Sequence, residues 1–263
     1  MGFAYDIESM PDVQLVAADF NPQIFVDVPL DTSKWKLQKT IDAKLAEYNT
    51  DEARAKRVAA HAAKETKRYE DILEKAALDA SISRILCISY QFDEYGDPWN
   101  KEGASNVVEW GDEDRLLYDL WKRCEIVQRN SGKVFTCSSS QFDLYFCWRR
   151  TLAAGVLIPT SLRLIEMWKG RYSLADTFVD VAQTWAGGAY GCYTSVNRLA
   201  RVFGVQPKAD QDGVTGANFW KVYLEEGRDR VEPYALRDSA VVWEIAEKLI
   251  DMGIFKFQET HPK

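Results

Sequence analysis

Residues 3–8 read Phe-Ala-Tyr-Asp-Ile-Glu, a run that predicts a short strand carrying two acids. Side chains alternate between the two faces of a strand, so Asp6 and Glu8 share one face while Ile7 points to the other. Neighbouring carboxylates repel each other, and a divalent cation between them relieves that repulsion. Oxygen ligands without His or Cys favour Mg²⁺ or Mn²⁺ over Zn²⁺. The alternative is an edge strand whose two carboxylates are simply exposed to solvent.

The rest of the apolar pattern predicts a sheet covered by helices. Further strands are predicted at residues 82–92, 105–110 and 133–137, the first two as a hairpin. Helices are predicted at residues 112–124, 142–154, 193–203, 218–226 and 233–252. Residues 11–30 look like additional extended chain, and Pro233 is predicted to start the last helix. Strands that alternate with helices predict an α/β fold with a mixed central sheet.

Residues 31–80 differ from their surroundings because they are rich in Ala and in charges of both signs. Between Glu47 and Glu70 large apolar side chains are scarce, so helices formed there have almost no core face. This composition predicts a helical insertion that projects into solvent from a single domain spanning residues 1–263. The insertion is interpreted either as an arm over a substrate or partner, or as a solvated hairpin.

Composition restricts the chemistry that the chain can perform. Lys and Arg number 33 against 40 Asp and Glu, and the net charge of −7 excludes a strongly basic coat protein while allowing a local basic groove. The histidines are only two, His61 and His261, so His-based catalysis and His-ligated zinc are not expected. Five cysteines without a CxxC motif indicate free thiols in a reducing cytosol. With no apolar run of the ~18 residues that a membrane span needs and no signal-peptide pattern, we expect a cytoplasmic protein without membrane contacts.

Two further motifs place acids at helix starts. Asp143 follows Phe142 where a predicted strand turns into a helix, and such turns face the carboxyl ends of strands, where sites usually lie. Ordinary capping and a favourable dipole charge are the alternative interpretation of Asp143. Tyr234 and Asp238 are four residues apart in the last predicted helix, so they share a face. Each motif alone is also compatible with an ordinary helix surface.

Taken in order, these motifs resemble the DEDD superfamily of 3′–5′ exonucleases in its tyrosine-containing (DEDDy) branch. The closest similarity is to the proofreading domain of family B DNA polymerases and to stand-alone bacterial and phage relatives. The three motifs are Asp6-Ile7-Glu8-Ser9, Phe142-Asp143 and the segment Tyr234 to Asp238, and the resemblance covers residues 3–12 and 82–250. Pro233 stands where the His-containing branch would have its His, which favours the Tyr branch. Ser138 departs from the Asn that the family often has there.

The resemblance implies an RNase H-like fold and two-metal phosphodiester hydrolysis. Asp6, Glu8, Asp143 and Asp238 would hold two Mg²⁺ or Mn²⁺ ions, and Tyr234 would orient the attacking water. Residues 122–171 contain nine Lys/Arg and three Asp/Glu, which makes them the expected track for a phosphate backbone. Candidate substrate-binding residues are Ser9, Ser138, Gln141, Phe142, Arg149 and Trp35. Trp35, with Lys34, Lys36 and Lys39, is expected to contact nucleic acid from the root of the insertion.

The expected activity is a 3′–5′ exonuclease that degrades single-stranded DNA or frayed 3′ ends to 5′-mononucleotides. A 3′–5′ exoribonuclease remains open, because RNA-trimming enzymes share this set of carboxylates with a Tyr. A catalytically weak module of the same fold that binds nucleic acid or a polymerase is the non-enzymatic alternative. A polymerase or repair protein acting in trans is a further candidate partner.

Overall fold

The central strand β1 (Gly2–Pro11) lies in the middle of a five-stranded sheet ordered β3-β2-β1-β4-β5. The computed structural model describes residues 2–27, 31, 38–97, 105–137, 142–159, 177–187, 194–208 and 213–255. The other strands are β2 (Ser83–Phe92), β3 (Asn106–Trp110), β4 (Lys133–Thr136) and β5 (Phe178–Asp180). β2 runs antiparallel to both β1 and β3, while β4 runs parallel to β1 and β5 parallel to β4. The predicted α/β fold with a mixed sheet is confirmed, and the short strand β5 was not predicted.

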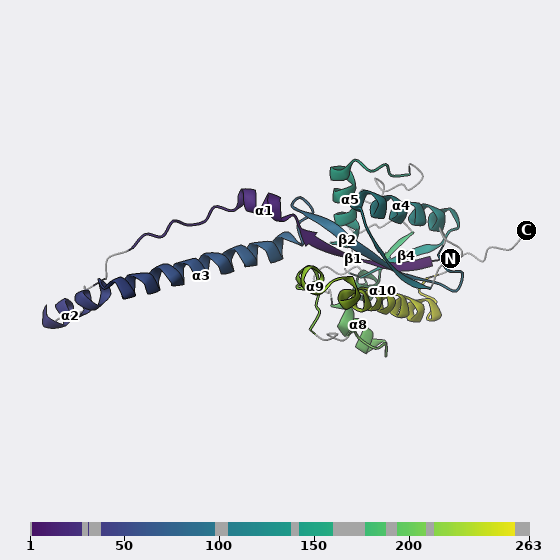
Figure 1. Cartoon of the computed structure of the whole chain (residues 1–263). Coiled ribbons are helices and arrows are strands. Elements are labelled where there is room, and N and C mark those ends of the chain that lie inside the picture. The colour runs from purple at the N-terminus through teal and green to yellow at the C-terminus, as the bar shows by residue number, and fades with distance from the viewer. Residues whose placement is uncertain are drawn as a thin grey trace, which may run out of the picture.

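Helices cover both faces of this sheet (Figure 1). One face of β1, which includes Phe3 and Tyr5, packs in a core formed with α4 (Glu113–Arg129) and α5 (Asp143–Ala154). Ala4 on the other face packs in a core formed with α8 (Val196–Val202) and α10 (Arg228–Asp251). Because side chains alternate along a strand, Asp6 and Glu8 lie on the same face as Ala4, toward α10.

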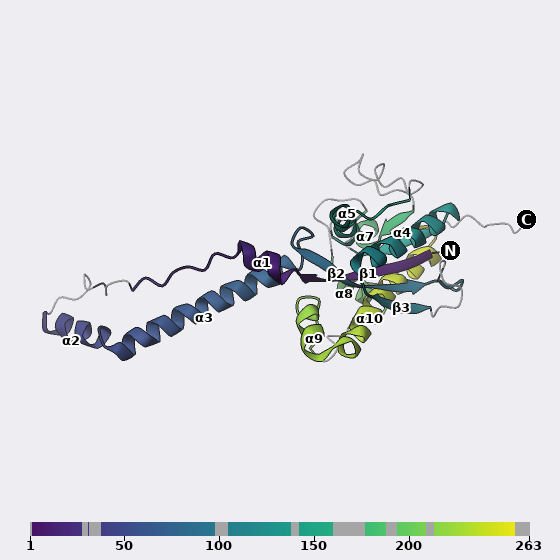
Figure 2. The ribbon, with the colours of Figure 1, turned by 45° about the horizontal axis from the view of Figure 1, so that its top comes forward.

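A long arm interrupts the chain between β1 and β2. Its helices are α2 (Gln38–Tyr48) and α3 (Asp51–Ala76), and both views show them extending away from the sheet (Figures 1 and 2). Thr50 caps α3, with its hydroxyl accepting the Ala53 N–H at 3.2 Å. The last turns of α3 return to the core, where Leu73 and Ala76 are buried. The helical insertion predicted for this region is therefore present as an arm with a buried base.

The arm begins earlier in the chain than residue 31. The chain already leaves the sheet at α1 (Val13–Asp19), and residues 21–27 run outward beside α3 (Figure 1). The expectation of extended chain throughout residues 11–30 was therefore wrong for α1. Asp12 caps this helix by accepting the N–H groups of Gln14 and Leu15 at 3.0 and 3.2 Å. A short run of mixed apolar and polar residues fits a helix as well as a strand, and the Asp cap decides between them.

The C-terminal helices also differ in detail from their predicted bounds. Helix α10 begins at Arg228, so Pro233 lies inside the helix rather than at its start. Gly227, at a φ of 90°, separates α10 from α9 (Phe219–Glu226). Pro233 has no N–H, so it cannot donate to the carbonyl of Asp229 one turn earlier. Among the described residues, no helix is both long and apolar enough to span a membrane.

Candidate metal centre

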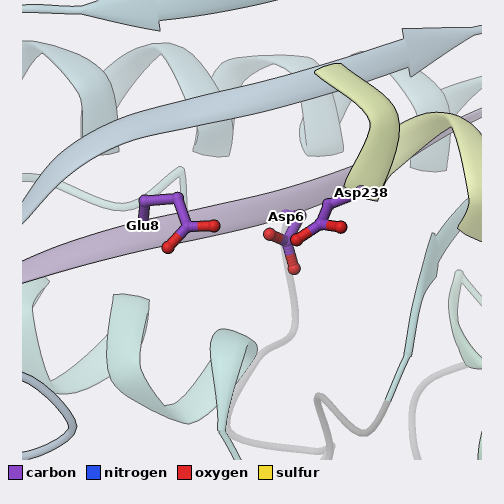
Figure 3. A group of neighbouring side chains, drawn as sticks. All are labelled: Asp6, Glu8 and Asp238. Atoms are coloured by element: carbon purple, nitrogen blue, oxygen red, sulfur yellow. The ribbon is translucent and has the colours of Figure 1, made fainter. Parts of the chain in front are cut away.

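Three carboxylates from two distant parts of the chain meet beside the central strand. Asp6 and Glu8 come from β1 and Asp238 from α10, and one oxygen of each lies within 4.8 Å of the others (Figure 3). Glu8 is 8% exposed and Asp238 5% exposed, so the cluster is largely withdrawn from water. Alternation along β1 places the first two acids on the face that α10 covers. The third acid lies on the side of α10 that packs against this face.

The cluster holds more negative charge than its surroundings compensate. Burial, followed by the charge of Asp238, raises the pKa of Asp6 from its usual 3.8 to about 7, although Lys208 opposes this. Burial and the charges of Asp6 and Asp238 likewise raise the pKa of Glu8. One oxygen of Asp238, Oδ1, is buried without a hydrogen-bond partner. Oxygen ligands, excess negative charge and an unpaired carboxylate oxygen together fit a hard divalent cation such as Mg²⁺ or Mn²⁺.

Asp143 lies at the first residue of α5, close to this cluster but outside the group of three. It is 5% exposed, and its pKa is raised by burial and then by the charges of Asp6 and Asp180. The charges of all four predicted acids thus interact in the structure. Three of them, Asp6, Glu8 and Asp238, are close enough together to bind one metal ion. The aromatic ring of Phe142, which precedes Asp143, packs on Phe146 with a centroid separation of 5.2 Å.

Asp180 is an acid of this region that the sequence analysis missed. It ends β5 and is 2% exposed. Its Oδ1 accepts the N–H groups of Ala182 and Gln183 at 2.8 and 3.2 Å, which caps the short helix α7 (Val181–Ala186). A strand of three residues leaves almost no periodic signal in a sequence, so its position beside Asp143 could not be deduced.

Lys208 is a second residue beside the cluster that was not among the predicted site residues. Its ammonium Nζ donates to Asp238 Oδ2 at 2.7 Å and to Tyr234 Oη at 3.0 Å. Burial disfavours the ammonium, but the carboxylates of Asp238 and Asp6 outweigh it and raise the pKa of Lys208. Lys208 is therefore a charged counter-ion for one edge of the cluster. It follows α8 in a loop, where local spacing does not show which acid it contacts.

Tyr234 is buried at 4% exposure and lies on the same side of α10 as Asp238. Burial and the charge of Asp238 raise the pKa of its phenol, although Lys208 opposes this. The phenol therefore stays protonated near neutral pH and can orient a neighbouring group but cannot serve as a base. Phe219 packs on the Tyr234 ring at a centroid distance of 5.9 Å and helps to fix its position.

The structure describes some of the predicted substrate-binding residues and not others. The Ser9 hydroxyl donates to the carbonyl of Ala77 and so helps to anchor the base of the arm, while its role in substrate binding stays a prediction. Arg149 is exposed on α5 and remains available. Ser138, Gln141 and Trp35 lie outside the described residues. Helix α2 lies at the far end of the arm (Figure 1), and the root is formed by α1 and the end of α3.

The chain matches no protein-family model and no curated protein.

Proposed function

We propose that the chain is a metal-dependent 3′–5′ exonuclease of the DEDDy type, which hydrolyses single-stranded DNA or frayed 3′ ends to 5′-mononucleotides. The observation that carries this proposal is the meeting of the Asp6, Glu8 and Asp238 carboxylates, of which Asp238 has one buried oxygen without a hydrogen-bond partner. Asp143 and Tyr234 lie next to them, as the sequence motifs require. The strand order and directions are also compatible with an RNase H-like fold.

Each residue has a distinct part in this proposal. Asp6, Glu8, Asp143 and Asp238 would hold two Mg²⁺ or Mn²⁺ ions, because carboxylates are their preferred protein ligands. When bound, such ions supply an activated water and stabilise the leaving 3′ oxygen. Tyr234 keeps its proton and positions the attacking water through a hydrogen bond. The exposed Arg149 is a candidate for contact with the phosphate backbone.

A labelled oligonucleotide tests the proposal directly. A single-stranded DNA with a 5′ label should shorten in steps from its 3′ end in Mg²⁺ or Mn²⁺ and remain intact in excess EDTA. Asp238→Asn should abolish cleavage, whereas Asp251→Asn, an exposed acid on the same helix, should not change it. Full cleavage in EDTA, or immediate release of the 5′ label, contradicts the proposal.

Two alternatives are separated by the same assay. An RNA of the same sequence, cut faster than the DNA, would identify an exoribonuclease, because discrimination depends on contacts to the 2′-OH. Binding of either strand without cleavage in any divalent metal would indicate a module that only binds nucleic acid. A polymerase or repair protein acting in trans is compatible with either outcome.

A further inference from the structure

Residues 21–27, here called the edge segment, run along α3 and are fixed to it by polar contacts. Near one end, the backbone N–H of Gln23 donates to a carboxylate oxygen of Glu65 at 2.9 Å. At the other end, both oxygens of Asp27 accept from the Arg57 guanidinium, at 2.7 and 2.8 Å. Two-point contacts between a guanidinium and a carboxylate restrict orientation as well as distance. The edge segment is therefore held in one conformation on the helix.

The middle of the edge segment presents apolar side chains to solvent. Phe25 turns toward α3 and meets His61 at a ring-centroid distance of 5.5 Å. Its two neighbours are exposed to solvent, Ile24 by 87% and Val26 by 71%. Within the described part of the chain, the backbone N–H and C=O groups of these three residues have no hydrogen-bond partner. Exposed β-branched side chains beside unpaired backbone groups are the features of an open strand edge.

These features suit an extended polypeptide. A partner strand would pair its own N–H and C=O groups with those of residues 24–26, which no phosphate or sugar chain can reproduce. Alternation would place every second side chain of the partner over Ile24 and Val26, where apolar residues fit best. The requirement is therefore an extended peptide with apolar residues at alternate positions.

The positive charge of α3 beside the edge segment indicates which residues the partner peptide carries between its apolar positions. From Arg54 to Arg68, α3 contains six Lys or Arg residues and one acid, Glu65. Lys64 and Lys67 are exposed and form no ion pair among the described residues. These two free ammonium groups favour a partner with Asp or Glu.

We propose that the edge segment binds an extended acidic segment of a partner protein, which adds to it as a β-strand. A second copy of this chain fits less well, because pairing about Phe25 would bring two basic stretches of α3 together. Nucleic acid also fits less well, because Arg57 and Arg68 already pair with Asp27 and Glu65, and phosphates would leave Ile24 and Val26 uncovered.

A random library of displayed peptides tests this inference, because it samples many extended sequences at once. The full chain serves as bait, and the Ile24→Ser/Val26→Ser variant serves for counter-selection. Enriched peptides should alternate apolar and acidic residues. A synthetic copy should bind the variant about tenfold more weakly, in line with the loss of two apolar cross-strand pairs. N-methylation of alternate amides in that peptide should abolish binding, because it removes the backbone donors.

Matched variants distinguish a specific edge from a sticky surface. Lys64→Ala/Lys67→Ala should weaken binding and flatten its dependence on salt. Leu157→Ser, which replaces an equally exposed apolar residue far from the arm in sequence, should have no effect. Absence of enrichment, or equal binding to the double Ser variant, overturns the proposal. The proposal is also overturned if the wild type forms a dimer in sedimentation experiments and the double Ser variant does not. The same holds if the wild type binds single-stranded DNA and the double Ser variant does not.

Discussion

The ammonium of Lys208 lies 2.7 Å from Asp238 Oδ2, while the other oxygen of the same carboxylate is buried without a hydrogen-bond partner. Asp238 therefore has one oxygen neutralised by the protein and one that lacks a partner. The first contact fixes the carboxylate, and Tyr234, bonded to the same ammonium, is fixed with it. Asp238 also belongs, with Asp6 and Glu8, to a cluster of carboxylates that repel one another, and a bound cation would relieve that repulsion. Lys208 thus holds Asp238 and Tyr234 in place without saturating the site.

Lys208→Met should destabilise the metal-free protein. The substitution keeps the length of the side chain but leaves Asp238 buried without its counter-ion, and breaking a buried pair in this way costs about 3–5 kcal/mol. Urea unfolding in EDTA measures this loss. Mg²⁺ should stabilise the variant more than the wild type, because the negative charge of the carboxylates is no longer partly neutralised by Lys208. Lys248→Met, at an exposed position of α10, is the control. Equal stability of Lys208→Met and wild type in EDTA would contradict the assigned role.

Stability in EDTA should fall as pH rises through neutrality. In the unfolded chain Asp6 loses its proton near its usual pKa of 3.8, whereas in the folded protein its pKa is about 7. Between these values the folded state binds more protons than the unfolded state, so stability decreases with rising pH. Melting temperatures of wild type and Asp6→Asn should converge at low pH. They should differ by at least about 2 °C at pH 8, with the variant higher. A wild type that is the more stable of the two at pH 8 in EDTA contradicts this prediction.

Tyr234→Phe should lower turnover while leaving substrate affinity nearly unchanged. The substitution removes only the hydroxyl, which bonds to Lys208 and is placed to orient water. We expect kcat to fall by about ten- to a hundredfold with a nearly constant KM, as positioning effects do. Unfolding in EDTA should show a loss of only about 0.5–1.5 kcal/mol for the missing hydrogen bond. Tyr118→Phe, at an exposed tyrosine, is the control. An unchanged kcat would remove Tyr234 from the mechanism.

The central sheet and the positions of the acids were predictable from local pattern. Alternation in residues 3–8 determined which face carries Asp6 and Glu8, and helical spacing placed Tyr234 and Asp238 together. The hairpin of β2 and β3 followed from two apolar runs around a turn. These features depend on neighbours within a few residues, which a sequence displays directly.

The contacts of Lys208 and Asp180 were not predictable in the same way. Lys208 lies 30 residues before Asp238, in a loop, and its contact exists only because α10 crosses the sheet. Asp180 belongs to a strand of three residues, which is too short to show an alternating apolar pattern in the sequence. The start of the arm was misplaced for a similar reason. Residues 21–27 are held by α3 through side chains such as Arg57, about 30 positions later in the chain.

The distal part of the arm should be dispensable for folding, whereas its base should not. Residues 47–70 include Glu65, which is buried against the edge segment, but they contribute little to the cores around the sheet. Leu73, at 9% exposure, lies in the core that also contains Tyr234 and Cys87. Replacing residues 47–70 with a short Gly/Ser link should therefore leave the unfolding free energy and the exonuclease rate nearly unchanged. Leu73→Ala should cost about 2–4 kcal/mol through the cavity it creates. Urea unfolding compares the two variants, with Leu78→Ala at an exposed position just beyond α3 as the control. If the link variant unfolds as easily as Leu73→Ala, or loses cleavage while remaining folded, the distal arm takes part in the core or in catalysis and this division of the arm is wrong.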